Sequence, residues 1–174
     1  YVISHGFQPI AYGCLRFGGA AVLFAAVTWV RERSFRLRRR DLWMLVPAAL
    51  IGIFLNQLSF VYAIKLTTAT TVALLFGTLP VLTGLFAFAL GIERLGSRFW
   101  LAAVLAFGGA ALVALGGGGG VSGQLWGDLL GFAASATWAW YTVSVSPLLQ
   151  RYSTLRVSAV AFTLGSLPLF AVGS

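Results

Sequence analysis

The stretch Arg31-Glu-Arg-Ser-Phe-Arg-Leu-Arg-Arg-Arg40 decides the fold, because it lies between two long apolar runs, Pro9–Val30 and Leu42–Ile64. Crossing a bilayer core takes roughly 20 helical residues, and each run is about that long. Further along, the chain carries four more apolar runs: Thr70–Leu90, Phe99–Leu115, Gly127–Leu149 and the shorter Val157–Val172. The sequence therefore predicts an all-α protein, a polytopic bundle of transmembrane helices.

Basic residues alternate between the connections of these runs. The segment 31–40, the pair Arg94 and Arg98, and the pair Arg151 and Arg156 hold ten of the twelve lysines and arginines, whereas the intervening connections hold only Lys65. Loops rich in arginine and lysine stay in the cytoplasm. The arginine-bearing connections are therefore expected on the cytoplasmic side.

The composition excludes most other classes of protein. The chain is 59% hydrophobic and only 9% charged, against roughly 25% charge in soluble domains. We expect a multi-pass protein of a prokaryotic plasma membrane, with the lipid bilayer as a partner. The net charge of +8 then reflects membrane orientation and does not indicate a nucleic-acid partner. A single cysteine and a single histidine predict no metal site, no cofactor and no catalytic residues.

Turn and helix-breaking residues mark the expected helix ends. Asp41 is a suitable N-cap for a helix that starts at Leu42, and Thr67–Thr71 predicts a tight turn. Gly116–Gly120 predicts a flexible outer loop. Pro80 should kink its helix because it leaves the carbonyl of Phe76 without its usual donor.

Trp138 and Tyr141 fall near the middle of Gly127–Leu149, away from the membrane interfaces where tryptophan and tyrosine usually lie. They are three residues apart and are therefore neighbours on the helix surface. Two interpretations remain open, helix packing and a substrate-lining face.

Three other polar residues lie inside apolar runs: Arg16, Asn56 and Gln57. Asn56 and Gln57 either bond between helices or line a cavity. Arg16 either contacts an anionic group in a cavity or reaches the outer headgroups. Because Glu93 and Asp128 are expected at helix ends and Glu32 and Asp41 in a loop, any proton coupling should depend on groups outside this chain.

The ends of the chain suggest part of a longer protein. It begins without Met on Tyr1-Val-Ile-Ser, which has the character of a last helical turn, and it ends on an apolar run that is short for a span.

Several motifs in order resemble the EamA-type drug/metabolite transporters. These are Leu15-Arg-Phe17, Pro80 in a run that ends Leu90-Gly-Ile-Glu-Arg-Leu95, a Gly/Ala-rich run after it, and Gly127-Asp-Leu-Leu-Gly131 leading to Thr137-Trp-Ala139. The resemblance implies ten helices in two inverted five-helix repeats. Residues 1–126 would then hold helices two to five of the first repeat, and residues 127–174 helix six and part of helix seven.

The resemblance also implies a secondary transporter that exports small metabolites such as amino acids or related compounds, with no catalytic role. The candidate substrate-binding residues are Arg16, Asn56, Gln57, Trp138 and Tyr141. An integral membrane enzyme is the first alternative, but no nucleophile and base can be assembled from four carboxylates and one histidine. A helical scaffold without transport is the second, and it leaves the central polar residues unexplained. The oligomeric state and the substrate are not determined by the sequence.

The predicted orientation can be tested with cysteine labelling. A cysteine introduced within Gly117–Gly120 should react with an impermeant thiol reagent added to intact cells, and one at Ser34 should not. The reverse pattern would contradict the topology.

Overall fold

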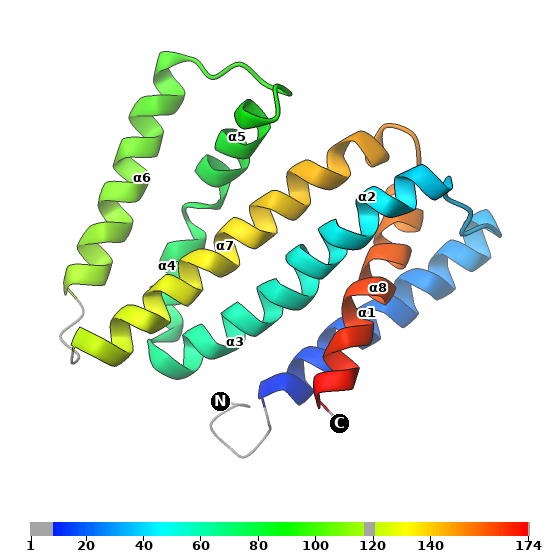
Figure 1. The fold of residues 1–174 in the computed structure, drawn as a ribbon, viewed down its shortest axis with the longest axis horizontal. Coiled ribbons are helices and arrows are strands. Elements are labelled where there is room, and N and C mark those ends of the chain that lie inside the picture. The colour runs from blue at the N-terminus through cyan, green and yellow to red at the C-terminus, as the bar shows by residue number, and fades with distance from the viewer. Residues whose placement is uncertain (1–8, 117–120, 174) are drawn as a thin grey trace. The chain divides into compact units, whose positions relative to one another are not determined.

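The computed structural model describes residues 9–116 and 121–173, and places the side chains of residues 13–109, 111–112 and 125–171. All regular structure in these residues is helical (Figure 1). The expectations for the first residues of the chain and for the loop positions 117–120 lie outside the described residues.

Every apolar run identified in the sequence is helical. The elements in chain order are α1 Pro9–Glu32, α2 Arg39–Ala49, the π-helix η2 Leu50–Leu55, α3 Asn56–Leu66, α4 Ala69–Phe76, α5 Leu79–Ala89, α6 Ser97–Gly116, α7 Val121–Leu149 and α8 Thr154–Gly173. The all-α prediction is confirmed.

Four of the described helical segments are long and apolar enough to cross a membrane: Gly13–Glu32, Arg39–Leu66, Ala69–Ala89 and Thr154–Ala171. In α6 the apolar stretch Ser97–Gly109 is shorter. The helix predicted over Gly127–Leu149 is present within α7, but α7 is not among the four. The aromatic residues Trp138, Trp140 and Tyr141 and several hydroxyl side chains lower its mean hydropathy.

The described chain divides into two compact units. Unit 1 consists of residues 1–55 and 144–174, and unit 2 of residues 56–143. The boundaries fall at the start of α3 and inside α7, so two long helical segments each contribute to both units.

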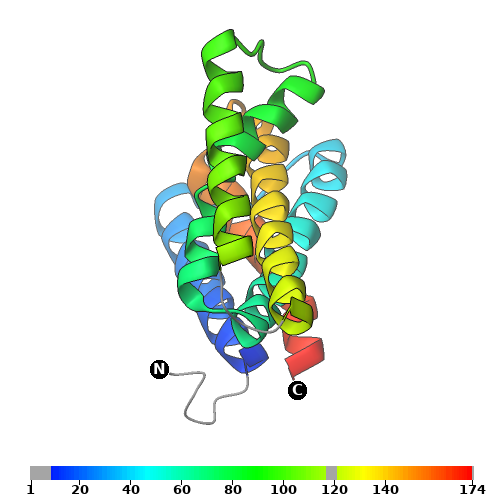
Figure 2. The same ribbon diagram turned by 90° about the vertical axis from the view of Figure 1, so that its left-hand side faces the viewer.

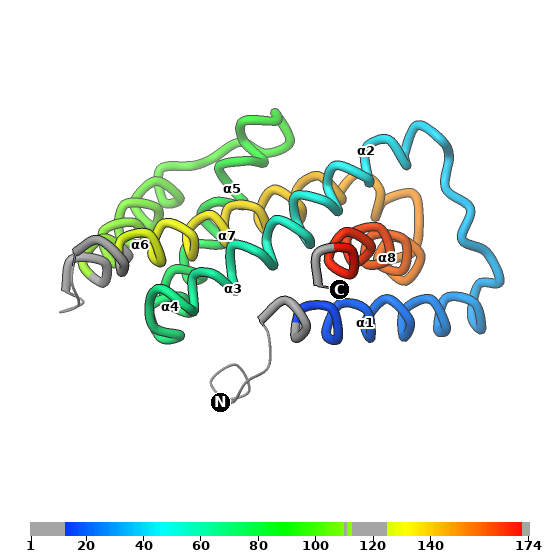
Figure 3. The backbone as a smooth tube through the Cα atoms, turned by 60° about the horizontal axis from the view of Figure 1, so that its bottom comes forward, coloured from blue at the N-terminus to red at the C-terminus, as the bar shows by residue number. Residues whose placement is uncertain are grey.

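In unit 1, α1 and α8 lie side by side and run antiparallel (Figures 1 and 3). The ring of Phe162 lies 5.4 Å from that of Phe24 and 5.9 Å from that of Phe17. Nearer the other end of the pair, the Cys14 thiol donates to the carbonyl of Leu169 over 3.2 Å. Burial of these apolar side chains holds the two helices together.

A glycine allows α8 to pack closely on the helix of residues 39–55. A Cβ atom at Gly165 would lie 2.5 Å from Cβ of Ile53 and 3.1 Å from the carbonyl oxygen of Ala49. Only glycine permits this approach of the two backbones. The contact falls on the end of α2 and on η2, where Ile53 is fully buried.

In unit 2, two glycines of α7 permit similar contacts. A Cβ at Gly131 would lie 2.9 Å from a methyl group of Leu75, and one at Gly127 would lie 2.7 Å from the backbone nitrogen of Thr67. Figure 2 shows α6 running beside α7, where the rings of Phe107 and Phe132 are 6.0 Å apart.

Two predicted helix starts are wrong. The helix expected to start at Leu42 begins at Arg39 with Arg38 as its N-cap residue, and Asp41 lies in its first turn. Asp41 does not cap because its carboxylate bonds to side chains of another loop. The helix of Asp128 begins at Val121, so this carboxylate lies inside α7 rather than at its end.

The predicted kink at Pro80 is a full interruption. The helix stops at Phe76 and restarts at Leu79, with Gly77 and Thr78 in between. The turn predicted over Thr67–Thr71 is shorter: only Thr67 and Thr68 separate α3 from α4, and Thr68 caps α4 by accepting a hydrogen bond from the N–H of Thr71 over 3.1 Å.

The Gly165 contact gives a prediction about stability. Gly165→Ala should destabilise the full-length protein by about 1–3 kcal/mol, because the added methyl group must displace Ile53 or the backbone of Ala49. Thermal unfolding in detergent measures the effect. Gly108→Ala is the matched control, since a Cβ there meets nothing within 4 Å and alanine is the better helix former. Equal melting temperatures for the two variants would contradict the close contact.

Candidate functional site

The interruption between α4 and α5 is a focus of polar contacts in unit 2. The carbonyl oxygen of Leu75 accepts hydrogen bonds from the Thr78 N–H over 3.1 Å and from the Thr78 hydroxyl over 2.7 Å. It also accepts one from the Ser135 hydroxyl of α7 over 3.1 Å. The bond from Ser135 joins the interruption to α7, one helical turn before Trp138.

Asn56 bonds α3 to the same part of α7. Its Nδ2 donates to the carbonyl of Ala134 over 2.6 Å and to the hydroxyl of Thr137 over 3.4 Å. Of the two interpretations of Asn56, the bond between helices is therefore present. Asn56 is the first residue after η2, and a π-helical turn changes the rotational phase of the residues after it. The π-helix thus sets the direction in which Asn56 points.

Gln57 is buried without a hydrogen-bond partner for its amide nitrogen. It is 1% exposed, and its Nε2 has no hydrogen-bond partner in the described structure. A buried donor that lacks an acceptor costs about 1–3 kcal/mol. Such a group can bind an acceptor atom of a substrate without first breaking another bond.

Trp138 and Tyr141 are neighbours on α7, as their spacing predicts. Their ring centroids are 5.6 Å apart with planes inclined by 43°. Tyr141 is buried and Trp138 is partly buried, in contrast to Trp43 and Trp126, which are 80% and 64% exposed near helix ends. These tryptophans therefore belong to two different environments.

Arg16 lies on an exposed part of α1 in unit 1. Its guanidinium carbon is 5.3 Å from the ring centroid of the adjacent Phe17. The other four candidate residues belong to unit 2. Both interpretations of Arg16 remain compatible with this position.

Asp128 is a polar group that the sequence interpretation missed. It is 5% exposed, and neither carboxylate oxygen has a hydrogen-bond partner in the described structure. The hydroxyl oxygen of Thr67 likewise lacks a partner, and Gly127 packs against the backbone of Thr67. The sequence could have indicated this burial only through the position of Asp128 inside a helix, and that position depends on where α7 starts. A buried carboxylate can accept hydrogen bonds from a cationic group.

Two loops of unit 1 are joined by an interloop cluster, which we define as Glu32, Asp41, Arg151, Tyr152 and Arg156. In its first half, the Tyr152 hydroxyl donates to Asp41 Oδ2 over 2.7 Å, and Arg151 lies 3.4 Å from Asp41 Oδ1. The backbone N–H of Arg38 donates to the same tyrosine oxygen over 3.2 Å. Asp41 is 2% exposed, so these donors compensate for the loss of water around its carboxylate.

The second half of the interloop cluster connects the end of α1 with the start of α8. A nitrogen of Arg156 lies 2.7 Å from Glu32 Oε2, and the Ser153 hydroxyl bonds to Glu32 Oε1. Glu32 lies beyond the apolar run that ends at Val30. Its pKa is lowered, chiefly by the hydrogen bond from Ser153 and further by Arg156. The two halves together hold the α1–α2 loop against the α7–α8 loop.

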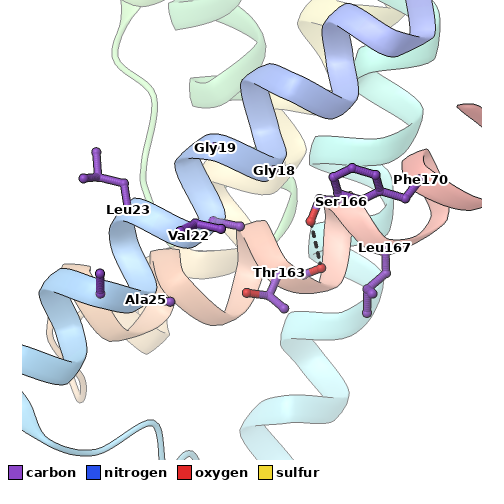
Figure 4. Close-up of a pocket in the computed structure, with 11 residues that line it drawn as sticks. Gly18, Gly19, Val22, Leu23, Ala25, Thr163, Ser166, Leu167 and Phe170 are labelled. Atoms are coloured by element: carbon purple, nitrogen blue, oxygen red, sulfur yellow. Dashed lines mark hydrogen bonds between the residues drawn. The ribbon is translucent and has the colours of Figure 1, made fainter.

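An apolar groove of about 760 Å³ runs along the α1–α8 pair (Figure 4). Gly18, Gly19 and Val22 line it from α1, and Leu167 and Phe170 line it from α8. Its polar atoms are few, since the Ser166 hydroxyl is bonded to the carbonyl of Thr163 over 3.1 Å. The groove offers apolar contact and no cluster of charges. Among the described residues, no three His, Cys, Asp or Glu side chains could jointly hold a metal ion.

The chain is similar to known membrane proteins. Residues 2–115 match the model of the EamA-like transporter family. The uncharacterized transporter YetK of Bacillus subtilis is 29% identical over 157 residues, which are 88% of this chain and 48% of that protein. The uncharacterized transporter YwfM of the same organism is 28% identical over 164 residues, 92% of this chain and 54% of that protein. The chain thus spans about half the length of these relatives. No solved structure gives a significant match.

The interloop cluster predicts a dependence of stability on pH. Because the pKa of Glu32 is lowered by folding, its contacts stabilise the protein above the ordinary value of 4.5, and this contribution disappears as the pH falls through the lowered pKa. Glu32→Gln should therefore reduce the melting temperature at neutral pH and have progressively less effect in acid. Glu93→Gln, in an exposed loop, serves as the control. A constant difference between Glu32→Gln and wild type at all pH values would contradict this role.

Proposed function

The chain belongs to the EamA-like transporter family, and we propose that it forms part of a secondary transporter that exports small metabolites, such as amino acids or related compounds. The family and the names of both relatives indicate a membrane transporter rather than an enzyme. Export and the substrate class are inferred from the family resemblance. The observation that carries a transport role for these residues is the set of polar groups inside apolar helices, above all the unpartnered amide nitrogen of Gln57.

The proposed substrate-binding residues are Arg16, Asn56, Gln57, Trp138 and Tyr141. Gln57 would donate to a substrate acceptor, and the rings of Trp138 and Tyr141 would contact its apolar part. Both hydrogen bonds of Asn56 use Nδ2, which leaves its Oδ1 to accept from a substrate donor. Arg16 belongs to unit 1 and is proposed by itself, as a group that could bind a carboxylate.

The mixed chemistry of these groups supports a substrate with polar and apolar parts. Asp128 extends the proposal, since its carboxylate could receive the ammonium group of an amino acid. An interrupted helix near such groups is typical of transporter sites, because backbone atoms freed from the helix can bond to the substrate. The α4–α5 interruption has this character, although Ser135 already occupies the carbonyl of Leu75.

We also propose that the chain supplies helices two to seven of a ten-helix protein, with residues 1–126 from the first inverted repeat and residues 127–174 from the second. The complete path then needs helices outside this chain. Uptake into vesicles that contain the full-length protein, measured with a panel of radiolabelled metabolites, tests transport and identifies the substrate. Equal uptake by vesicles with and without the protein for every compound would contradict the proposal.

The aromatic pair gives the sharpest test of the site. Trp138→Ala and Tyr141→Ala should each reduce transport per folded molecule about tenfold or more, because a buried aromatic contact contributes about 1.5–3 kcal/mol. The amount of folded protein should stay near that of wild type. Trp126→Ala removes an exposed tryptophan of the same helix and is the matched control. Unchanged transport per folded molecule in both variants, with less folded protein, would show that the pair only packs the bundle.

A further inference from the structure

The segment from Arg31 to Arg40, which we call the α1–α2 loop and which includes the last two residues of α1 and the first two of α2, carries a dense positive charge that the proposed transport function does not use. Its six arginines are all exposed: Arg31, Arg33, Arg36, Arg38, Arg39 and Arg40. The ion pairs among the described residues use Arg151 and Arg156 and none of these six side chains. The acidic residue of the loop, Glu32, is engaged by Arg156. The segment therefore presents six uncompensated guanidinium groups.

This loop has a defined path. The ring of Phe35 stacks on that of Trp29 with centroids 6.1 Å apart and planes inclined by only 9°. The N–H of Arg36 donates to the Ser34 hydroxyl over 3.3 Å, and the N–H of Arg38 donates to Tyr152. Arg33 has φ 53°, which turns the chain back at the end of α1. The loop thus folds over the ends of its helices (Figure 3) and does not resemble a free basic tail.

Exposed aromatic side chains fix the depth of the loop. Trp29, Phe35 and Trp43 are 55%, 38% and 80% exposed and lie directly before, within and after the loop. Exposed tryptophans at the ends of spans lie at the level of the lipid headgroups. The guanidinium groups between them must lie at the same level, beside the phosphates.

We propose that the loop from Arg31 to Arg40 is a binding surface for anionic phospholipid headgroups of the cytoplasmic leaflet. Arginine binds a phosphate group through two parallel hydrogen bonds, which suits it to this ligand better than a point charge. Each basic residue near an anionic membrane surface strengthens the attraction about fivefold. The interloop cluster contributes by holding the loop in place through Tyr152 and Arg38. This inference requires a membrane location and does not depend on transport.

The test measures lipid preference directly. Full-length protein is purified, exchanged into nanodiscs that contain equal amounts of phosphatidylglycerol and phosphatidylcholine, and released for native mass spectrometry that counts the lipids retained. Wild type should retain phosphatidylglycerol preferentially, and the preference should fall as salt is raised. Arg36→Gln/Arg39→Gln should lower the preference about tenfold or more.

The matched control is Arg94→Gln/Arg98→Gln. It removes two exposed arginines from another connection on the predicted cytoplasmic side, where Phe88 and Trp100 meet edge to face across the connection. This variant should lower the preference less than Arg36→Gln/Arg39→Gln does, because Arg94 and Arg98 form an isolated pair whereas six guanidinium groups lie together between Arg31 and Arg40.

Three outcomes would overturn the inference. The first is equal retention of the two lipids by wild type. The second is an equal loss of preference in both double variants, which would show that the lipid preference depends on the total charge of the protein and not on this loop. The third is release of phosphatidylglycerol by a short RNA added in excess, which would show that the loop prefers nucleic acid. If Arg36→Gln/Arg39→Gln fails to fold, the salt dependence of wild type still decides, because a preference unchanged at high salt excludes headgroup binding by these arginines.

Discussion

Backbone polar groups inside a bilayer must be hydrogen-bonded within the protein, because lipid offers no partners. The interruption between α4 and α5 meets this constraint through Thr78 and Ser135, which both donate to the carbonyl of Leu75. Of these two residues, Ser135 also joins the broken helix to α7. Asn56 connects α3 to the same turn of α7, at Ala134 and Thr137. The polar interior of unit 2 follows from satisfying these backbone groups.

Some buried polar side chains of unit 2 have no hydrogen-bond partner, in contrast to these well-bonded groups. Gln57 Nε2 and both oxygens of Asp128 are buried without partners in the described structure. Each lowers stability relative to a satisfied group by about 1–3 kcal/mol or more. Such groups can form hydrogen bonds with a ligand without first giving up a bond to the protein. The substrate site proposed for unit 2 rests on these groups.

Much of the candidate site could be anticipated from the sequence. The neighbouring position of Trp138 and Tyr141 follows from helix periodicity, and the depth of Asn56 and Gln57 follows from their place inside an apolar run. Whether the side chain of each residue bonds to the protein or remains available to a ligand depends on neighbours that are distant in sequence. Asn56 is 78 residues away from Ala134, and no local pattern predicts that pair. The position of Asp128 inside a helix was not predicted, because the start of α7 lies in polar and glycine-rich sequence without a clear helix signal.

The sequence by itself determined the helical class, the approximate ends of the helices and the expected side of the arginine-rich loops, because hydropathy and charge act locally against the bilayer. Only the tertiary structure decided that Asp41 bonds to Tyr152 instead of capping α2, that a π-helix precedes Asn56, and that Gly165 permits close packing on Ile53. These features depend on the partner that packing brings to each residue. A tertiary contact overrides the local conformational preference of a residue where it provides a hydrogen bond to a buried polar group or improves the packing of the interior.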